Sequence, residues 1–179
     1  MFSILTETGI ARYFFVMFYQ HIHRIYIPNG IYFVTTNVRN RTPLFMNRDI
    51  VRIVERSIWH ARTSLFVTYA FVVMPDHLHL LIHPKKGNIS EIMKSIKENS
   101  SRDINTYIRQ TYSGDGAVAA IGRFEWQKGF YDHVIRDERD FFTHIEYIRY
   151  NPVKAGLCKE PEEYPFLFVD EEAIQKASG

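Results

Sequence analysis

The chain has 179 residues, and 22 Lys and Arg against 20 Asp and Glu leave a formal net charge of +2. The length favours a single domain with its own hydrophobic core, and so small a charge gives no argument for nucleic acid by itself. Cys158 is the only cysteine, which excludes an internal disulfide and a cysteine-based zinc cluster and fits a reducing compartment.

An apolar run, Tyr13 to Tyr19, lies near the N-terminus. It is too short to span a bilayer, and the residues after it do not resemble a signal-peptide cleavage site. We therefore expect a cytoplasmic protein with no membrane partner. Its first residues are expected to form a leader, with Met17 as another candidate start.

The next part of the chain predicts a strand and then a helix. β-branched and aromatic residues from Ile31 to Val38 favour a strand that runs into the polar sequence Arg39-Asn40-Arg41. Asn47 can cap a helix of about four turns, because apolar residues recur at helical spacing after it.

A β-hairpin and a second helix are expected to follow. Leu65 to Met74 is nearly continuous apolar sequence, and Pro75-Asp76 is a turn signal. His77 to His83 then forms the second strand of the hairpin. Ser90 can cap the next helix, whose apolar pattern is interrupted by a Ser-Ser pair.

The last third of the chain begins with a loop. Residues from Thr111 to Gly122 are rich in Gly, Ser and Ala, and Arg123 to Ile135 contains two short strand-like pieces around Gly129. Asp137 opens a third helix. After that helix, prolines and a glycine are expected to interrupt any regular structure.

The expected order is therefore β, α, β, β, α, β, α. This order predicts an α+β fold of the ferredoxin-like type, with an antiparallel sheet, helices on one face and an additional C-terminal helix. The sequence contains no internal repeat and no linker.

The triplet His77-Leu78-His79 is the most informative short motif. On a strand, residues two apart point to the same face at a Cα separation of about 7 Å, so two imidazoles can converge on one divalent ion. For an isolated pair, ordinary surface or hydrogen-bonded histidines are the more common explanation. A metal centre with two histidines would also need a third protein ligand and an open position.

The third helix offers a tyrosine and an asparagine. Tyr147 and Asn151 are four residues apart and would share a face of a regular helix. A phenol beside an amide oxygen fits a metal-assisted nucleophile, although a packing role is the default for such a pair. Pro152 is expected to place Asn151 at a helix end, because the residue before a proline avoids helical geometry.

Four segments, in this order, closely resemble the REP-associated tyrosine transposases. That family is a branch of the single-tyrosine HUH endonucleases, which include the insertion-sequence-200-like transposases. The segments are Ile31 to Arg41, Val72 to Ile82, Phe130 to Arg136 and Tyr147 to Leu157. The resemblance implies a leader at 1–22, a transposase domain at 23–168 and a C-terminal tail at 169–179.

The resemblance also implies the roles of four residues. His77 and His79 correspond to the metal-binding histidines of the family, and Tyr147 to its nucleophile. Asn151 corresponds to the third metal ligand in the REP-associated branch. The implied activity is that of an HUH-type endonuclease and strand transferase, which cuts single-stranded or hairpin DNA with Mg²⁺ or Mn²⁺ and forms a 5′-phosphotyrosine.

The implied partner is DNA, which would associate the protein with the nucleoid. If the protein binds DNA, several basic residues would contact phosphates and one aromatic ring would stack on a base. If it does not, the basic residues would form a solvated surface and the ring would have a packing role. These candidates are Arg39, Arg41, Lys97, Arg136, Arg149 and Tyr150. The REP-associated branch tends to act as a monomer, so we expect a monomer, with a dimer as the alternative.

Two other functions remain open at the level of the sequence. One is a protein that binds DNA hairpins but no longer cuts them, although such a protein would not need Tyr147 and three metal ligands together. The other is a hydrolase in which a metal-bound water attacks the DNA, which would form no covalent adduct between protein and DNA.

Overall fold

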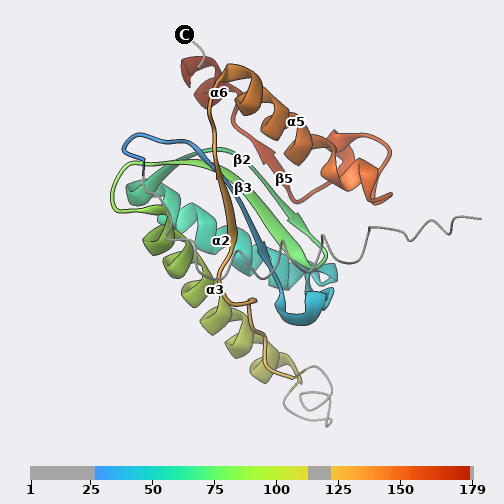
Figure 1. Ribbon diagram of the computed structural model, residues 1–179. Helices are drawn as coiled ribbons and strands as arrows, with labels where there is room; N and C mark the ends of the chain where they lie inside the picture. The colour runs from blue at the N-terminus through green and yellow to red at the C-terminus, as the bar shows by residue number, and fades with distance from the viewer. Residues whose placement is uncertain (1–26, 113–121, 178–179) are drawn as a thin grey trace, which may run out of the picture.

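A five-stranded antiparallel sheet lies at the centre of the fold, with the strand order β4-β1-β3-β2-β5 (Figure 1). The computed structural model describes residues 27–112 and 122–177. The apolar run near the N-terminus and most of the loop expected before residue 122 lie outside these ranges. The strands are β1 (Tyr32–Asn37), β2 (Phe66–Met74), β3 (His77–Pro84), β4 (Tyr131–Val134) and β5 (Leu167–Val169).

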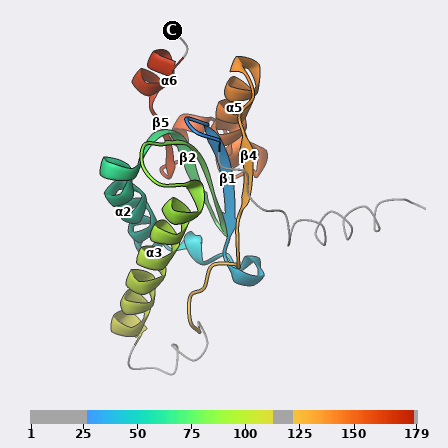
Figure 2. The same cartoon turned by 60° about the vertical axis from the view of Figure 1, so that its left-hand side comes forward.

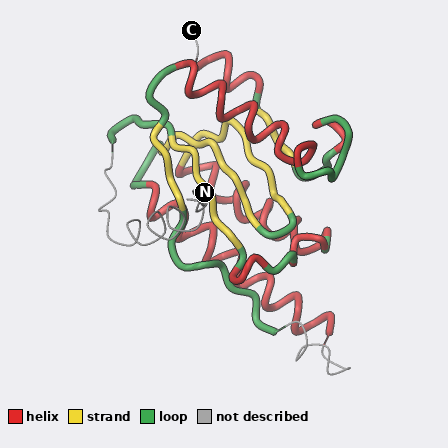
Figure 3. Tube along the Cα trace, turned by 45° about the vertical axis from the view of Figure 1, so that its right-hand side comes forward, coloured by secondary structure: helices red, strands yellow, loops and turns green. Residues whose placement is uncertain are grey.

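Helices cover both faces of this sheet (Figures 2 and 3). The helices α2 (Arg48–Leu65) and α3 (Ile89–Tyr112) pack on one face and contribute most helical side chains of the larger core. The helices α5 (Glu138–Lys154) and α6 (Glu171–Ala177) pack on the other face over a smaller core. The expected α+β fold with its tyrosine-bearing helix is therefore confirmed.

Helix α2 begins where its capping residue predicts. The Asn47 side-chain oxygen accepts hydrogen bonds from the backbone nitrogens of Asp49 at 2.9 Å and Ile50 at 3.3 Å. Two of the N–H groups that lack a partner inside the helix are thereby satisfied. Asp49 in the first turn adds a favourable charge near the positive end of the helix dipole.

The sequence predicted Ser90 as the cap of helix α3, but the residue that caps it is Asn88. Asn88 Oδ1 accepts from the Glu91 backbone nitrogen at 3.0 Å, and Glu91 Oε2 accepts from the Asn88 nitrogen at 3.1 Å. This reciprocal pair is a capping box whose N-cap is an asparagine. The helix therefore starts two residues earlier than the sequence suggested.

The Ser-Ser pair does not interrupt α3, which continues over 24 residues. Ser100 is fully buried, and its hydroxyl donates to the Ile96 carbonyl at 2.7 Å. The same oxygen accepts from Trp126 Nε1 at 2.9 Å. Both polar groups are satisfied inside the core, so a serine costs little at this helical position.

The register of the sheet decides which side chains face α5. Thr35 on β1 lies opposite His79 on β3, and Asn37 lies opposite His77. Because side chains alternate across a strand, these four residues share one face, and Leu78 points into the opposite core, where it is fully buried.

Helix α5 starts at the predicted cap, where Asp137 Oδ1 accepts from the Asp140 nitrogen at 2.8 Å. Its buried stripe consists of Phe141, Ile145, Ile148 and Pro152. The helix continues through Pro152 to Lys154, so Asn151 lies inside the last turn and not at a break before the proline. A proline near the end of a helix removes only one backbone hydrogen bond, which the packing of the stripe offsets.

Regular structure continues after α5, contrary to the expectation from the prolines. Strand β5 pairs with β2, and α6 packs beside α5. The Tyr164 hydroxyl donates to the Val73 carbonyl at 2.8 Å and fixes the returning chain on the sheet. Only one of the two strand-like pieces around Gly129 becomes a strand, because Trp126 forms just an isolated bridge with Val38.

We expect Asn47→Ala to lower the free energy of unfolding by about 1 kcal/mol, because two N–H groups of α2 lose their acceptor. Urea unfolding followed by circular dichroism measures the change. Asn47→Asp keeps the accepting oxygen and should remain close to the wild type. Equal losses in the two variants would show that the cap does not stabilise α2.

Candidate metal and nucleophile site

The two histidines of the His-x-His motif lie side by side on β3. The ring centroids of His77 and His79 are 4.7 Å apart, and the rings are nearly perpendicular, at 81°. Both candidate metal ligands therefore lie on β3, the central strand of the sheet.

Each histidine is oriented by a partner at its Nδ1 atom. His77 Nδ1 lies 2.5 Å from Asp76 Oδ1, and His79 Nδ1 lies 2.8 Å from Thr35 Oγ1. A carboxylate or hydroxyl that accepts from Nδ1 leaves Nε2 as the nitrogen with a lone pair. Such partners orient histidines that bind metals and raise their basicity.

Asp76 is itself held in place by Arg41. Arg41 Nε lies 2.8 Å from Asp76 Oδ2, and Arg41 Nη1 donates to Asn37 Oδ1 at 2.7 Å. Arg41 has a positive φ of 56°, a conformation that costs a residue with a side chain some backbone energy. These contacts hold the turn before His77 in one arrangement.

The buried Nε2 atom of His79 has no hydrogen-bond partner among the described residues. An unpaired buried polar atom costs free energy, which a bond to a metal ion would offset. The pKa of His79 is lowered to about 3, mainly by burial and to a smaller extent by the neighbouring His77 and Arg41. Burial also lowers the pKa of His77, although Asp76 opposes this shift. Both imidazoles are therefore neutral at pH 7, as metal ligands must be.

The Tyr147 ring approaches this pair from α5. Its centroid is 5.2 Å from that of His79 and 5.6 Å from that of Phe33. Tyr147 and Tyr150 are equally exposed, at 40%. Of the two, only Tyr147 has ring contacts with other described residues. The tyrosines therefore differ in the side chains around them and not in their exposure.

Asn151 and Lys154 follow Tyr147 on the same helix. Asn151 is half-buried and lies one turn beyond Tyr147, on the same face. The Lys154 ammonium lies over the Tyr147 ring at 5.9 Å from its centroid. The structure thus brings His77, His79 and Tyr147 together and places Asn151 in the adjoining turn.

Several predicted DNA-binding residues make contacts within the protein. Arg39 pairs with Glu125, and Lys97 Nζ donates to the backbone carbonyls of residues 127 and 129, each at 2.7 Å. Arg149 Nη2 lies 2.7 Å from Glu171 of α6. The role of these residues and of Arg41, Arg136 and Tyr150 in binding DNA stays a prediction.

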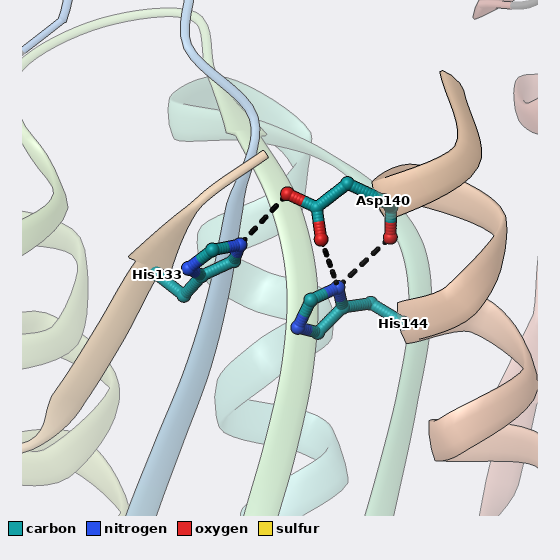
Figure 4. Close-up of side chains that lie close together, drawn as sticks. All are labelled: His133, Asp140 and His144. Carbon is teal, nitrogen blue, oxygen red and sulfur yellow. Dashed lines mark hydrogen bonds and ion pairs between the residues drawn. The ribbon is translucent and has the colours of Figure 1, made fainter. Parts of the chain in front are cut away.

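A second cluster lies beside this site and was not predicted. His133 of β4 meets Asp140 and His144 of α5 (Figure 4). Within the described ranges it is the one group of three His, Cys, Asp or Glu side chains that could hold a metal ion, with ligand atoms all within 4.8 Å of one another. The i,i+4 spacing of Asp140 and His144 is visible in the sequence, but the approach of His133 is not.

Comparison with known proteins places the chain in a family. The family model described as "Transposase IS200 like" matches residues 27–151. The chain belongs to this IS200-like transposase family. The REP-associated tyrosine transposase of Escherichia coli (strain K12) is 30% identical over 143 residues, which cover 80% of this chain and 78% of that protein. These two findings confirm the resemblance inferred from the four segments.

A solved structure supports the same family. It is a REP-associated tyrosine transposase bound to a REP hairpin, with 26% identity and a TM-score of 0.64, and the match covers 83% of this chain and 81% of that one. The family indicates an enzyme that acts on DNA. None of the described helices is long and apolar enough to cross a membrane.

We predict that His79 makes the metal-free protein less stable in acid. Its pKa is about 3 in the fold and about 6.5 in an unfolded chain, so between these values the unfolded state binds more protons. Its contribution to stability is complete above pH 6.5 and is lost as the pH falls toward 3. Urea unfolding in chelator should show a steeper decline from pH 7 to 4 for the wild type than for His79→Gln. Parallel profiles would contradict the low pKa.

Proposed function

We propose that the protein is a metal-dependent single-stranded DNA endonuclease and strand transferase, an HUH-type transposase with Tyr147 as its nucleophile. The observation that carries the proposal is the contact between the Tyr147 ring on α5 and His79 on β3, whose Nε2 is buried and unpaired. A nucleophile beside an unsatisfied metal ligand is the arrangement that this chemistry requires.

The residues present fit a divalent metal. His77 and His79 through Nε2, and Asn151 through its amide oxygen, would hold Mg²⁺ or Mn²⁺. When bound, the ion supplies Lewis acidity toward the scissile phosphate. The protein supplies the orientation, since Asp76 and Thr35 fix the two imidazoles.

Tyr147 would carry out the covalent step. Its phenol oxygen forms a bond to phosphorus, and the bond from phosphorus to the 3′ oxygen breaks. The phenol proton leaves to solvent, and the departing 3′ oxygen takes one up. The products are a 5′-phosphotyrosine and a free 3′-OH. Because one phosphodiester replaces another, attack by a 3′-OH reverses the step without ATP.

The proposed substrate is single-stranded DNA next to a hairpin. The support comes from the related structure that contains a REP hairpin. This chain offers two cationic groups for phosphates. Lys154 lies over the Tyr147 ring, and the exposed Arg136 lies between β4 and α5. We place this activity in the cytoplasm at the nucleoid, in a domain at 23–168.

We expect Tyr147→Phe to abolish cleavage and leave DNA binding within about twofold of the wild type, because only the phenol oxygen is removed. Labelled hairpin DNA with Mn²⁺, run on a denaturing gel, shows cleavage and any covalent adduct. Tyr150→Phe is the matched control and should keep most activity. A covalent adduct in the Tyr147→Phe protein would refute the assignment, and cleavage by the wild type without an adduct would favour a metal-bound water.

We also propose a monomeric active site, since the contact between Tyr147 and His79 forms within one chain. The test mixes the Tyr147→Phe protein with a His77→Ala/His79→Ala protein. A site built within one chain predicts no cleavage by the mixture. Restored cleavage would show that the tyrosine and the histidines meet across a dimer.

A further inference from the structure

The cluster of His133, Asp140 and His144 joins the edge strand β4 to the first turns of α5 (Figure 4). His133 Nε2 lies 2.8 Å from Asp140 Oδ2, and His144 Nδ1 lies 3.1 Å from Asp140 Oδ1. The two imidazole rings stack, with centroids 4.8 Å apart and an angle of 21° between their planes. The carboxylate therefore lies between two imidazole nitrogens that come from different elements.

The separations of these atoms fit a metal ion. Around a four-coordinate zinc with bonds of about 2.0–2.1 Å, ligand atoms are about 3.4 Å apart. One ligand atom from each of the three residues lies within 4.8 Å of the other two, and each imidazole nitrogen lies close to 3 Å from one oxygen of the Asp140 carboxylate, His133 from Oδ2 and His144 from Oδ1. An ion could replace the protons that now join the histidines to the carboxylate.

The donor set favours zinc over magnesium or calcium. Two imidazoles and one carboxylate are ligands that zinc prefers, whereas Mg²⁺ and Ca²⁺ prefer oxygen alone. His144 Nδ1 also lies 2.8 Å from the Asp140 carbonyl, so it carries a proton in the absence of metal. Binding of the ion at Nδ1 would move that proton to Nε2 of the same ring, so the neutral imidazole would release no proton.

The cluster is accessible to ions but separate from the His77 and His79 pair. Between 17% and 20% of each of its three side chains is exposed, and His133 lines a groove of about 1030 Å³. The Phe33 ring contacts both sites, with its centroid 4.6 Å from that of His144 and 5.3 Å from that of His79. No ligand is shared between the two sites.

We propose that His133, Asp140 and His144 form a second metal site, which binds Zn²⁺ with three protein ligands and one open position. An ion there fastens α5 to β4 one helical turn before Tyr147. The site thereby stabilises the helix that carries the tyrosine, without taking part in the bond changes at the phosphate.

Zinc titration of the full-length, chelator-treated protein by isothermal calorimetry tests this site. The cluster variant is His133→Gln/His144→Gln, which keeps side-chain amides for hydrogen bonds but removes the imidazole ligands. His83→Gln on β3 is the matched histidine control. We expect the cluster variant to bind one Zn²⁺ fewer per chain than the wild type and the control. The His77→Gln/His79→Gln protein should retain the cluster's zinc and gain thermal stability when zinc is added.

Two further measurements cover a cluster variant that fails to fold. Asp140→Asn keeps an acceptor for the Arg136 nitrogen and should weaken zinc binding at the cluster more than tenfold. In the wild type, imidazole nitrogen NMR signals of His133 and His144 should shift on addition of Zn²⁺. Unchanged stoichiometry in the cluster variant, unchanged affinity in Asp140→Asn, or absence of these shifts would each overturn the proposal and leave a hydrogen-bonded link without metal.

Discussion

The packing of α5 against the sheet is the interaction on which the candidate site depends. Phe141, Ile145 and Ile148 are buried, and the Phe141 ring meets Tyr69 edge to face at 5.0 Å. Burial of side chains of this size stabilises a fold by roughly 1.5–3 kcal/mol each. Tyr147 lies beside this stripe on the helix, so the same packing that anchors α5 also sets the distance between the phenol and His79.

The sheet supplies the other half of the site through its register. Thr35 orients His79 only because β1 and β3 pair with these two residues opposite each other. A shift of one residue would turn Thr35 and its neighbours to the other face. Asp76 in the turn between β2 and β3 orients His77 in the same way. Strand pairing and a short turn therefore orient the two neutral imidazoles.

Sequence patterns predicted the features that local chemistry controls. Alternation on a strand placed His77 and His79 on one face, and the caps Asn47 and Asp137 were found because their side chains act within a few residues. Strand β5 has three residues, too few for a pattern. The contacts of Thr35 with His79 and of His133 with Asp140 depend on strand pairing and on packing of α5, which no local window of sequence contains.

The most direct test of the account is an anomalous difference map from crystals of the full-length protein containing Mn²⁺. The account predicts a peak within bonding distance of Nε2 of His77 and of His79, on the side from which Asn151 and Tyr147 approach. No peak at these nitrogens in a crystal whose manganese occupies only other positions would contradict the assignment of the His77 and His79 pair as the metal centre.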